Sequence, residues 1–408
     1  MLFGRLRRPP PPVEPAPPVW KAHTLRDNYS LSDEQYALCA TLTNQVQDLY
    51  DQALPYSRSK GLDPQLVLPG NEWAEIVKTT GLEFRKDRAH LDYLRLHAPF
   101  AGYHLMFLDR LDVRHFAEPW NQEILDRFSR EGMTPEIVGF LADRVDPAQR
   151  LAPFVEEYRQ HLRNVDRRYI VRTPRLFGEI GLEIDGVLFN PDVTLCQSRI
   201  NGLLSAGVIG KLERDIARRG RARVLEIGPG YGALAYALRS FFGPDLEYIA
   251  VDLPSSLLYS ALYLSTLAGG QGCHILAPGS TLPGSFANLF LANYLFEEVA
   301  DRLAPIDLAL NTMSFTEMSP LQVRHYAETL RRLIGTDGVV FDENAAVRPH
   351  HTDSKAIFAD VFPFRKHVES TTVTTKNWCQ DVWANRYIGE VFDVSDHAAF
   401  HAAASGSD

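Results

Sequence analysis

The chain has 408 residues, of which 45% are apolar and 23% are charged; this balance is typical of a soluble protein with two or three domains. Its net charge of −9 argues against nucleic acid as a partner, because phosphate contacts need a basic surface. No run of about 18 apolar residues predicts a membrane span, and no apolar segment follows the first arginines as a secretory signal would require. The four cysteines are scattered without a C-x-x-C pair, so we expect reduced thiols and a cytoplasmic location.

The N-terminal stretch predicts an arm followed by a helix. Residues 1–30 are rich in proline, which favours an extended polyproline conformation. We expect a flexible arm there, with docking to a partner as the alternative. The capping box Ser32-Asp33-Glu34-Gln35 predicts a helix start, and Leu42, Val46 and Leu49 then recur on one helical face.

Two further helix starts are sharp, at Thr134 and Asp146, each with proline at the first helical position. We therefore expect residues 31–165 to form a mostly helical domain. The aromatic residues between 93 and 120, together with His104, are assigned to the core of that domain. Contact with a substrate is the alternative for them.

A change of pattern predicts a second domain over residues 166–394, followed by a disordered tail at 395–408. Strands alternate with helices there, which predicts a doubly wound, mostly parallel α/β sheet. A hairpin is expected at 169–171 and 186–189, strands at 223–227, 248–251, 274–276, 306–310 and 339–341, and last strands at 368–375 and 387–392. Helices are expected at 193–204, 207–218, 233–238, 255–267 and 320–334.

A glycine motif opens this sheet. The apolar strand Val224 to Ile227 runs into Glu226-x-Gly228-x-Gly230-x-Gly232, a turn that brings the backbone and the next helix N-terminus close to a ligand. Asp252 ends the following strand, where a carboxylate can accept both hydroxyls of a ribose. The motif also satisfies the NAD pattern through Ala233, so NAD(P), or a glycine turn without ligand, are alternatives to S-adenosyl-L-methionine (SAM).

With these residues the chain resembles the class I SAM-dependent methyltransferases, and more narrowly the bacterial family of sugar O-methyltransferases. The likeness rests on three segments, which are Val224-Leu225-Glu226-Ile227-Gly228-Pro229-Gly230-Tyr231-Gly232, Val251-Asp252-Leu253-Pro254 with Tyr263-Leu264, and Asp307 to Met318. It implies a Rossmann-like parallel sheet whose last strand is antiparallel, preceded by the helical domain.

The resemblance also implies roles for single residues. Glu226 would lie near the methionine amino group of SAM, and Asp252 would hold the ribose while Leu253 packs on the adenine. The remaining cofactor residues it implies are Gly228, Pro229, Gly230, Gly232, Asn311, Met313 and Ser314. The end of the expected third strand, Ala277 to Ser280, lacks the acid that often contacts the adenine amine, so backbone groups or Ser280 would have to replace it.

Transfer to a sugar hydroxyl needs a group that accepts the proton. Glu317, which follows the fourth strand, and His350 are the candidate bases; the alternatives are a helix-start charge and an exposed loop histidine. Asp342 and Glu343 are either further candidates or solvated strand ends. These two acids with His350 and His351 leave a divalent metal open, although no metal site is predicted. Gln197 and Arg199 contact either the acceptor or the SAM carboxylate, or they belong to a solvated helix face.

The sequence therefore predicts a cytoplasmic SAM-dependent methyltransferase that acts on a hydroxyl of a sugar or glycosylated metabolite and releases S-adenosyl-L-homocysteine. N- or O-methylation of another small metabolite or peptide is the first alternative. A SAM-binding partner protein without catalysis is the second. The expected partner is a small-molecule acceptor; a homo-oligomer is left open.

Overall fold

The structure is a computed structural model that describes residues 20–23, 27–70, 73–74, 84–96, 152–184, 186–345, 352–368, 378–396 and 398. The predicted helix starts at Thr134 and Asp146, as well as His104, His350 and His351, lie outside the described residues. So do most of the tail and most of the proline-rich arm.

The elements before the large sheet are mainly helical. In chain order they are β1 (Trp20–His23), α1 (Asp33–Lys60), α2 (Pro64–Val67), α4 (Arg88–Asp92), η2 (Leu94–Leu96), α8 (Ala152–Leu162), η4 (Arg167–Tyr169), β2 (Gly181–Ile184), β3 (Val187–Phe189), α9 (Pro191–Ser205) and α10 (Val208–Arg219). The capping box predicted at Ser32 is present at the start of α1.

The elements of the large sheet then alternate. They are β4 (Ala222–Ile227), α11 (Ala233–Phe242), η5 (Gly243–Asp245), β5 (Leu246–Asp252), α12 (Pro254–Leu267), β6 (Cys273–Ile275), β7 (Asn288–Ala292), α13 (Asn293–Leu303), β8 (Leu308–Thr312), η6 (Phe315–Glu317), α14 (Pro320–Ile334), β9 (Val339–Ala345), α15 (Ser354–Val361), β10 (Phe364–Val368) and β11 (Trp378–Ala384).

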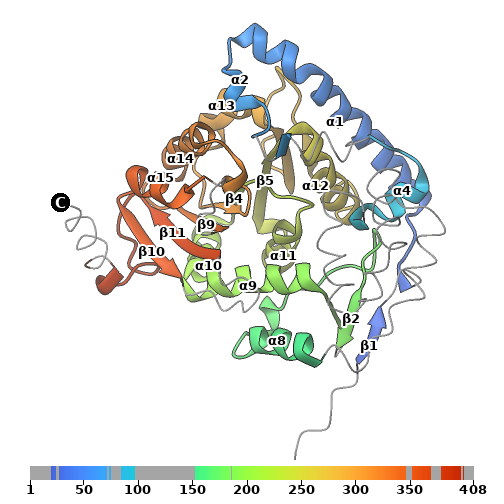
Figure 1. The fold of residues 1–408 in the computed structure, drawn as a ribbon, viewed down its shortest axis with the longest axis horizontal. Coiled ribbons are helices and arrows are strands. Elements are labelled where there is room, and N and C mark those ends of the chain that lie inside the picture. Colours follow the sequence, from blue (N-terminus) through green and yellow to red (C-terminus); the bar gives the residue numbers. More distant parts are fainter. Residues whose placement is uncertain are drawn as a thin grey trace, which may run out of the picture.

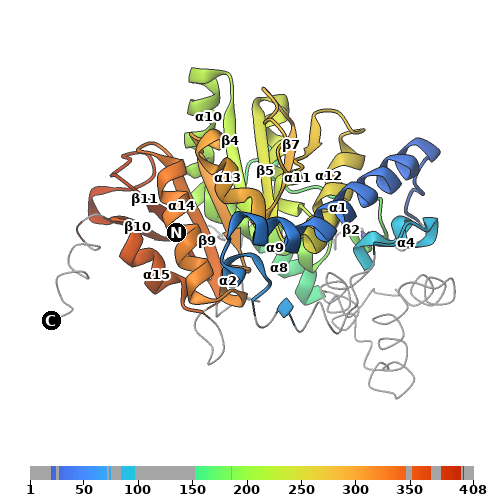
Figure 2. The same ribbon diagram turned by 90° about the horizontal axis from the view of Figure 1, so that it is seen from above.

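The eight-stranded sheet has the order β10-β11-β9-β8-β4-β5-β7-β6. Its strands from β9 to β6 pair in parallel, and β11 is antiparallel to both of its neighbours. The inner strands are apolar runs buried on both faces, as expected of parallel strands covered by helices on both sides. Helices α13 to α15 and helices α9 to α11 lie on opposite sides of this sheet in Figures 1 and 2. The predicted fold class is thus confirmed, including the antiparallel last strand.

Several predicted strands are wrong in position. The hairpin before the large sheet is formed by β2 and β3, whereas residues 169–171 form the end of a 3₁₀ turn and an extended segment. The last described strands are β10 and β11, and residues 387–392 form turns. Of the strand predicted at 368–375, Val368 ends β10 and the other residues lie outside the described residues. Residues 20–23, expected in the flexible arm, form a strand that pairs with β2.

One strand was missed. β7 lies between β5 and β6, and the predicted strand at 274–276 corresponds to β6 at the outer edge of the sheet. The strand next to β5 is therefore β7, which ends at Ala292 and is followed by Asn293. Ala277 to Ser280 instead follow β6, the strand at the edge of the sheet. The prediction for Ser280 was attached to the wrong strand.

Among the described residues one hydrophobic core includes members from Leu31 to Phe392. Helix α1 lies along one side of the molecule next to α12 (Figure 1), with Cys39 Sγ 3.2 Å from Thr266 Oγ1. The described N-terminal helices thus pack directly on the sheet and its helices. The boundary at residue 165 stays a prediction.

Candidate functional site

Four strand ends lie level at the carboxyl edge of the large sheet. Ile227 of β4 pairs with Val251 of β5 and with Asn311 of β8, and Asn311 pairs with Asp342 of β9. Because these strands are parallel, the loops that follow them open toward one region. The residues predicted for the cofactor lie in these loops and strand ends.

The glycine loop after β4 needs glycine at two positions for steric reasons. Gly228 has φ 71° and Gly232 has φ 96°, in the left-handed region that other residues avoid. A Cβ on Gly228 would overlap the hydroxyl of Ser314 and lie 2.7 Å from its Cβ, and one on Gly232 would lie 2.9 Å from the Leu264 side chain. Gly232 caps α11 without a side-chain bond, so the first N–H groups of this helix remain available to a ligand.

Glu226 is buried within β4, with 1% of its surface exposed. Its carboxylate accepts a hydrogen bond from the hydroxyl of Tyr248 and lies 3.5 Å from Thr312 Oγ1. Burial raises the pKa of Glu226 to about 7, while the Tyr248 hydrogen bond and the Arg199 charge act in the opposite direction. The group is therefore poised between its two charge states near neutral pH.

Asp252 and Glu317 add two more carboxyl groups. Asp252 Oδ1 accepts a bond of 2.8 Å from the backbone N–H of Leu253, the residue before α12. Burial, and then the charges of Glu317 and Glu226, raise the pKa of Asp252 to about 8. Glu317 ends η6 with a half-buried side chain, and its charge acts on Asp252, so this candidate base lies near that predicted cofactor acid.

The turn after β8 is held by Asn311. Its Nδ2 donates to Ile227 O at 2.9 Å and to Ser314 Oγ at 2.5 Å, and its Oδ1 accepts from Phe315 N and Asn344 Nδ2. The side chain is fully buried, and these bonds occupy both of its polar atoms. Asn311 is therefore placed to hold Ser314 against Gly228. Met313, which lies between Asn311 and Ser314 in the sequence, has φ 76°, a conformation that costs energy for any residue with a side chain.

Asp342 and Glu343 are not solvated strand ends, because both are buried inside β9. Successive residues of a strand point to opposite faces, and the two acids accordingly have different partners. Glu343 Oε1 accepts from Arg199 Nε at 2.7 Å, and its other oxygen accepts from Gln380. They are not arranged to share one metal ion.

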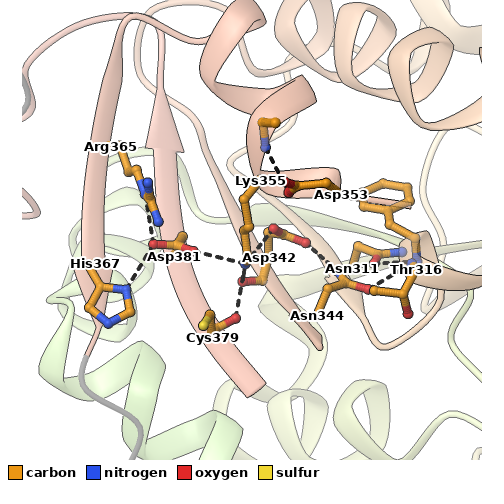
Figure 3. Close-up of polar contacts among 12 residues, drawn as sticks. Asn311, Thr316, Asp342, Asn344, Asp353, Lys355, Arg365, His367, Cys379 and Asp381 are labelled. Atoms are coloured by element: carbon orange, nitrogen blue, oxygen red, sulfur yellow. Dashed lines mark hydrogen bonds and ion pairs between the residues drawn. The ribbon is translucent and has the colours of Figure 1, made fainter. Parts of the chain in front are cut away.

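Asp342 belongs to an ion cluster between β9, β11 and α15 (Figure 3). Asp342 and Asp381 face each other across the β9–β11 pair, an arrangement of like charges that is normally unfavourable. Lys355 Nζ lies between them, 2.6 Å from Asp342 Oδ2 and 2.9 Å from Asp381 Oδ2. Arg365 and His367 bind the second oxygen of Asp381, at 2.9 and 3.1 Å.

The loops after β8 and β9 are tied together at their bases. Thr316 N donates to Asn344 Oδ1 at 3.2 Å, Thr352 N donates to Thr316 O at 3.2 Å, and Thr352 Oγ1 donates to Met318 O at 2.5 Å. In the sequence His350 falls between Asn344 and Thr352, outside the described residues, so its role stays a prediction.

The structure separates the two candidates on α9. The Gln197 side chain is buried and holds the chain at Tyr169 and Val171 through bonds of 3.2 and 2.8 Å, so it is not on a solvated face. The Arg199 side chain is 11% exposed and makes an ion pair with Glu343.

Arg95 is a site residue that the sequence analysis did not identify. This buried residue places its guanidinium carbon 3.4 Å from the ring centre of Tyr231 in the glycine loop. The only signal available in the sequence was an arginine within the otherwise apolar stretch Leu94–Leu96.

Among the described residues no group of three or more histidines, cysteines, aspartates or glutamates is placed to hold a metal ion. Within the same residues, no helix is long and apolar enough to cross a membrane.

The comparisons with known proteins give weak likenesses. No family model and no curated protein matches the chain. Similar solved structures include a Nostoc punctiforme protein provisionally named an O-methyltransferase, with 13% identity over 47% of this chain and 60% of that one and a TM-score of 0.31. The mitomycin 7-O-methyltransferase MmcR has 14% identity over 48% and 57%, with a TM-score of 0.29.

A third similar structure is the bifunctional kinase-methyltransferase WbdD, with 17% identity over 46% of this chain and 40% of that one and a TM-score of 0.33. The chain matches less than two thirds of the length of each of the three structures. At these values the likenesses do not bear on the activity of this chain.

The arrangement suits a cationic ligand with a ribose. Three carboxyl groups lie close enough for two of them to raise the pKa of the third, and a positive charge among them would favour their ionised forms. The open helix N-terminus of α11 faces the same edge and would suit a carboxylate. An amino acid joined to a nucleoside through a positively charged centre combines these features.

Proposed function

We propose that this chain is a SAM-dependent methyltransferase that methylates a hydroxyl of a sugar or glycosylated metabolite. The observation that carries the cofactor assignment is the close packing of Ser314 on Gly228, where a Cβ would overlap the serine hydroxyl, next to the carboxyl groups of Glu226 and Asp252 at the same edge of the sheet. Glu226 would hold the ammonium group of SAM and Asp252 the ribose, with Leu253 beside the adenine. The glycine loop, together with Met313 and Ser314, would surround the methionine part.

When bound, SAM supplies an electrophilic methyl group on a sulfonium. The residues of the chain hold the acceptor in line and remove its proton. Glu317 is proposed as the base because it follows β8 and lies near the acids at the carboxyl edge. Its carboxylate would take the hydroxyl proton as the oxygen–carbon bond forms and the carbon–sulfur bond breaks.

A sugar acceptor is proposed from the sequence resemblance, and its choice must be tested directly. The first measurement is SAM binding by isothermal titration calorimetry. The second is transfer of labelled methyl from SAM into a panel of nucleotide sugars, glycosides, amines and short peptides.

Each outcome of these measurements decides a separate part of the proposal. Transfer to a sugar hydroxyl supports it, and transfer to amines or peptides alone supports the first alternative. Binding without transfer to any acceptor would identify a non-catalytic SAM-binding protein. Absence of SAM binding by the wild-type chain would refute the cofactor assignment.

A further inference from the structure

A buried arginine from the N-terminal region lies on the glycine loop. Arg95 belongs to η2 and has 1% of its surface exposed. Its guanidinium lies 3.4 Å over the ring of Tyr231, the residue between Gly230 and Gly232. An edge-to-face contact with Tyr263 of α12, at 5.1 Å between ring centres, holds the same ring. Two segments 136 positions apart in the sequence thus meet at the proposed cofactor loop.

Arg95 is held in place on several sides. Its Nε donates to Glu179 Oε2 at 3.2 Å and its Nη2 donates to Asp192, just inside α9. Its backbone N–H donates to Phe177 O at 2.8 Å. Glu179 in turn accepts from Asn190 and Thr173. The guanidinium is therefore fixed before any ligand arrives.

This arrangement is not explained by stability. Taking an arginine and two carboxylates out of water is costly, and apolar side chains of similar size often replace such clusters without loss. Nη1 of Arg95, moreover, is buried without a hydrogen-bond partner among the residues that the structure describes, which adds to the cost. What the cluster does provide is a rigid, flat surface against one side chain of the glycine loop.

The loop needs such support because its backbone is intrinsically flexible. Gly228, Gly230 and Gly232 all have positive φ values, of 71°, 59° and 96°, and glycine loses more freedom on ordering than any other residue. Tyr231 is the large side chain between the last two of these glycines. Contacts of its ring with Arg95 and Tyr263 fix the loop in advance, and a loop fixed in advance binds its ligand more tightly.

We propose that Arg95 is a positioning residue for SAM: by stacking on Tyr231 it holds the glycine loop in its binding conformation and makes cofactor affinity depend on the docked N-terminal segment. This inference rests on the proposed function, because SAM is the ligand assigned to the loop.

The test compares SAM dissociation constants, measured by calorimetry at a temperature where every variant is folded. Tyr231→Leu removes the stacked ring but leaves every ion pair intact, and Tyr231→Phe keeps the ring. Arg95→Met would leave two buried carboxylates unpaired, so it is made together with Glu179→Gln and Asp192→Asn. We expect Tyr231→Leu and the triple variant to bind SAM at least about tenfold more weakly than wild type, which equals about 1.4 kcal/mol. Tyr231→Phe should bind SAM with the wild-type affinity.

Arg223→Lys is the matched control. Arg223 makes an ion pair of 2.7 Å with Glu247 and a bond of 2.7 Å to Leu303 O, but it lies at the opposite end of β4. This variant should lower the unfolding midpoint without weakening SAM binding. If it weakens binding as much as the triple variant does, the effect is one of general stability and the inference is overturned.

Two results separate the inference from the function on which it rests. Wild-type protein that fails to bind SAM overturns both. Wild-type protein that binds SAM, with Tyr231→Leu and the triple variant binding within twofold of it, overturns the role of Arg95 and leaves the proposed function standing.

Discussion

Replacing Tyr248 with phenylalanine tests whether Glu226 holds the ammonium group of SAM. The tyrosine hydroxyl donates to the Glu226 carboxylate, whose pKa is about 7. A hydrogen bond to a charged group contributes about 1.5–3 kcal/mol, and one pKa unit corresponds to about 1.4 kcal/mol. Loss of the hydroxyl should therefore raise the pKa of Glu226 by about one to two units.

The magnitude of the binding defect follows from the ionised fraction of Glu226. At pH 7 this fraction falls from about one half to about 10% or 1%, so SAM binding should weaken by about 5- to 50-fold. At pH 8 the same shift should weaken binding by only about 2- to 10-fold. In the wild type, SAM affinity should rise between pH 6 and pH 8 as the carboxyl group ionises.

The stability of the unliganded protein should change with pH in the opposite sense. Burial raises the pKa of Glu226 from 4.5 to about 7. The folded state therefore holds a proton that the unfolded chain has released in this range, and the contribution of Glu226 to stability falls as the pH rises from about 4.5 to 7. Urea unfolding at several pH values measures this contribution by comparing the wild type with Glu226→Gln, which cannot titrate.

The assay is calorimetric titration of SAM into Tyr248→Phe and wild-type protein at pH 6, 7 and 8. Tyr169→Phe is the matched control, because it also removes a tyrosine–glutamate hydrogen bond, that of 2.6 Å to Glu213 on α10. Equal affinities of Tyr248→Phe and wild type at pH 7 would refute the reasoning, as would a defect that does not shrink as the pH rises.

Three other predictions concern the glycine loop, the proposed base and the ion cluster. Gly228→Ala should weaken SAM binding at least about tenfold by calorimetry, because its left-handed backbone costs about 1–2 kcal/mol and its Cβ overlaps Ser314. The control is Gly220→Ala, at a position with φ 74° and open space around it. This variant should carry the backbone strain alone and bind SAM normally. Glu317→Gln should lower kcat about 10²- to 10⁴-fold in labelled-methyl transfer, while the dissociation constant of SAM changes less than about threefold. An unchanged kcat would exclude Glu317 as the base. Lys355→Met should destabilise the fold by about 3–5 kcal/mol in urea unfolding, since Asp342 and Asp381 lose their shared cation. Adding Asp342→Asn and Asp381→Asn should recover most of this loss. A Lys355→Met protein as stable as wild type would contradict the role of Lys355.

Much of the fold could be predicted because its signals are local. Strands β4, β5 and β9 are apolar runs bounded by turn residues, and the capping box at Ser32 marks a helix start. Strand β7 was missed for a physical reason. Helix α13 begins at the residue directly after it, so no turn residue separates the two elements in the sequence.

The residues of the candidate site were also predictable only where a local sequence pattern holds them together. Glu226, Asp252 and the glycines could be located because the strand–turn–helix pattern holds them within about 30 residues. Arg95 and its partners Glu179 and Asp192 lie 84 and 97 positions apart, and no local pattern brings them together. Asp342 could be located but not interpreted, because its burial depends on Lys355 and on a strand that was predicted elsewhere.

The packing of α1 has a consequence for how the chain folds during synthesis. Its buried face, with Leu42, Val46 and Leu49, is covered by elements that follow far later. The Tyr294 hydroxyl, for example, donates to Leu49 O across 245 positions. At about 5–20 residues per second on the ribosome, that partner emerges roughly 10–50 s after the helix. During this interval α1 has an uncovered apolar stripe, so the nascent N-terminal segment should be a binding site for chaperones and a source of aggregation in truncated chains.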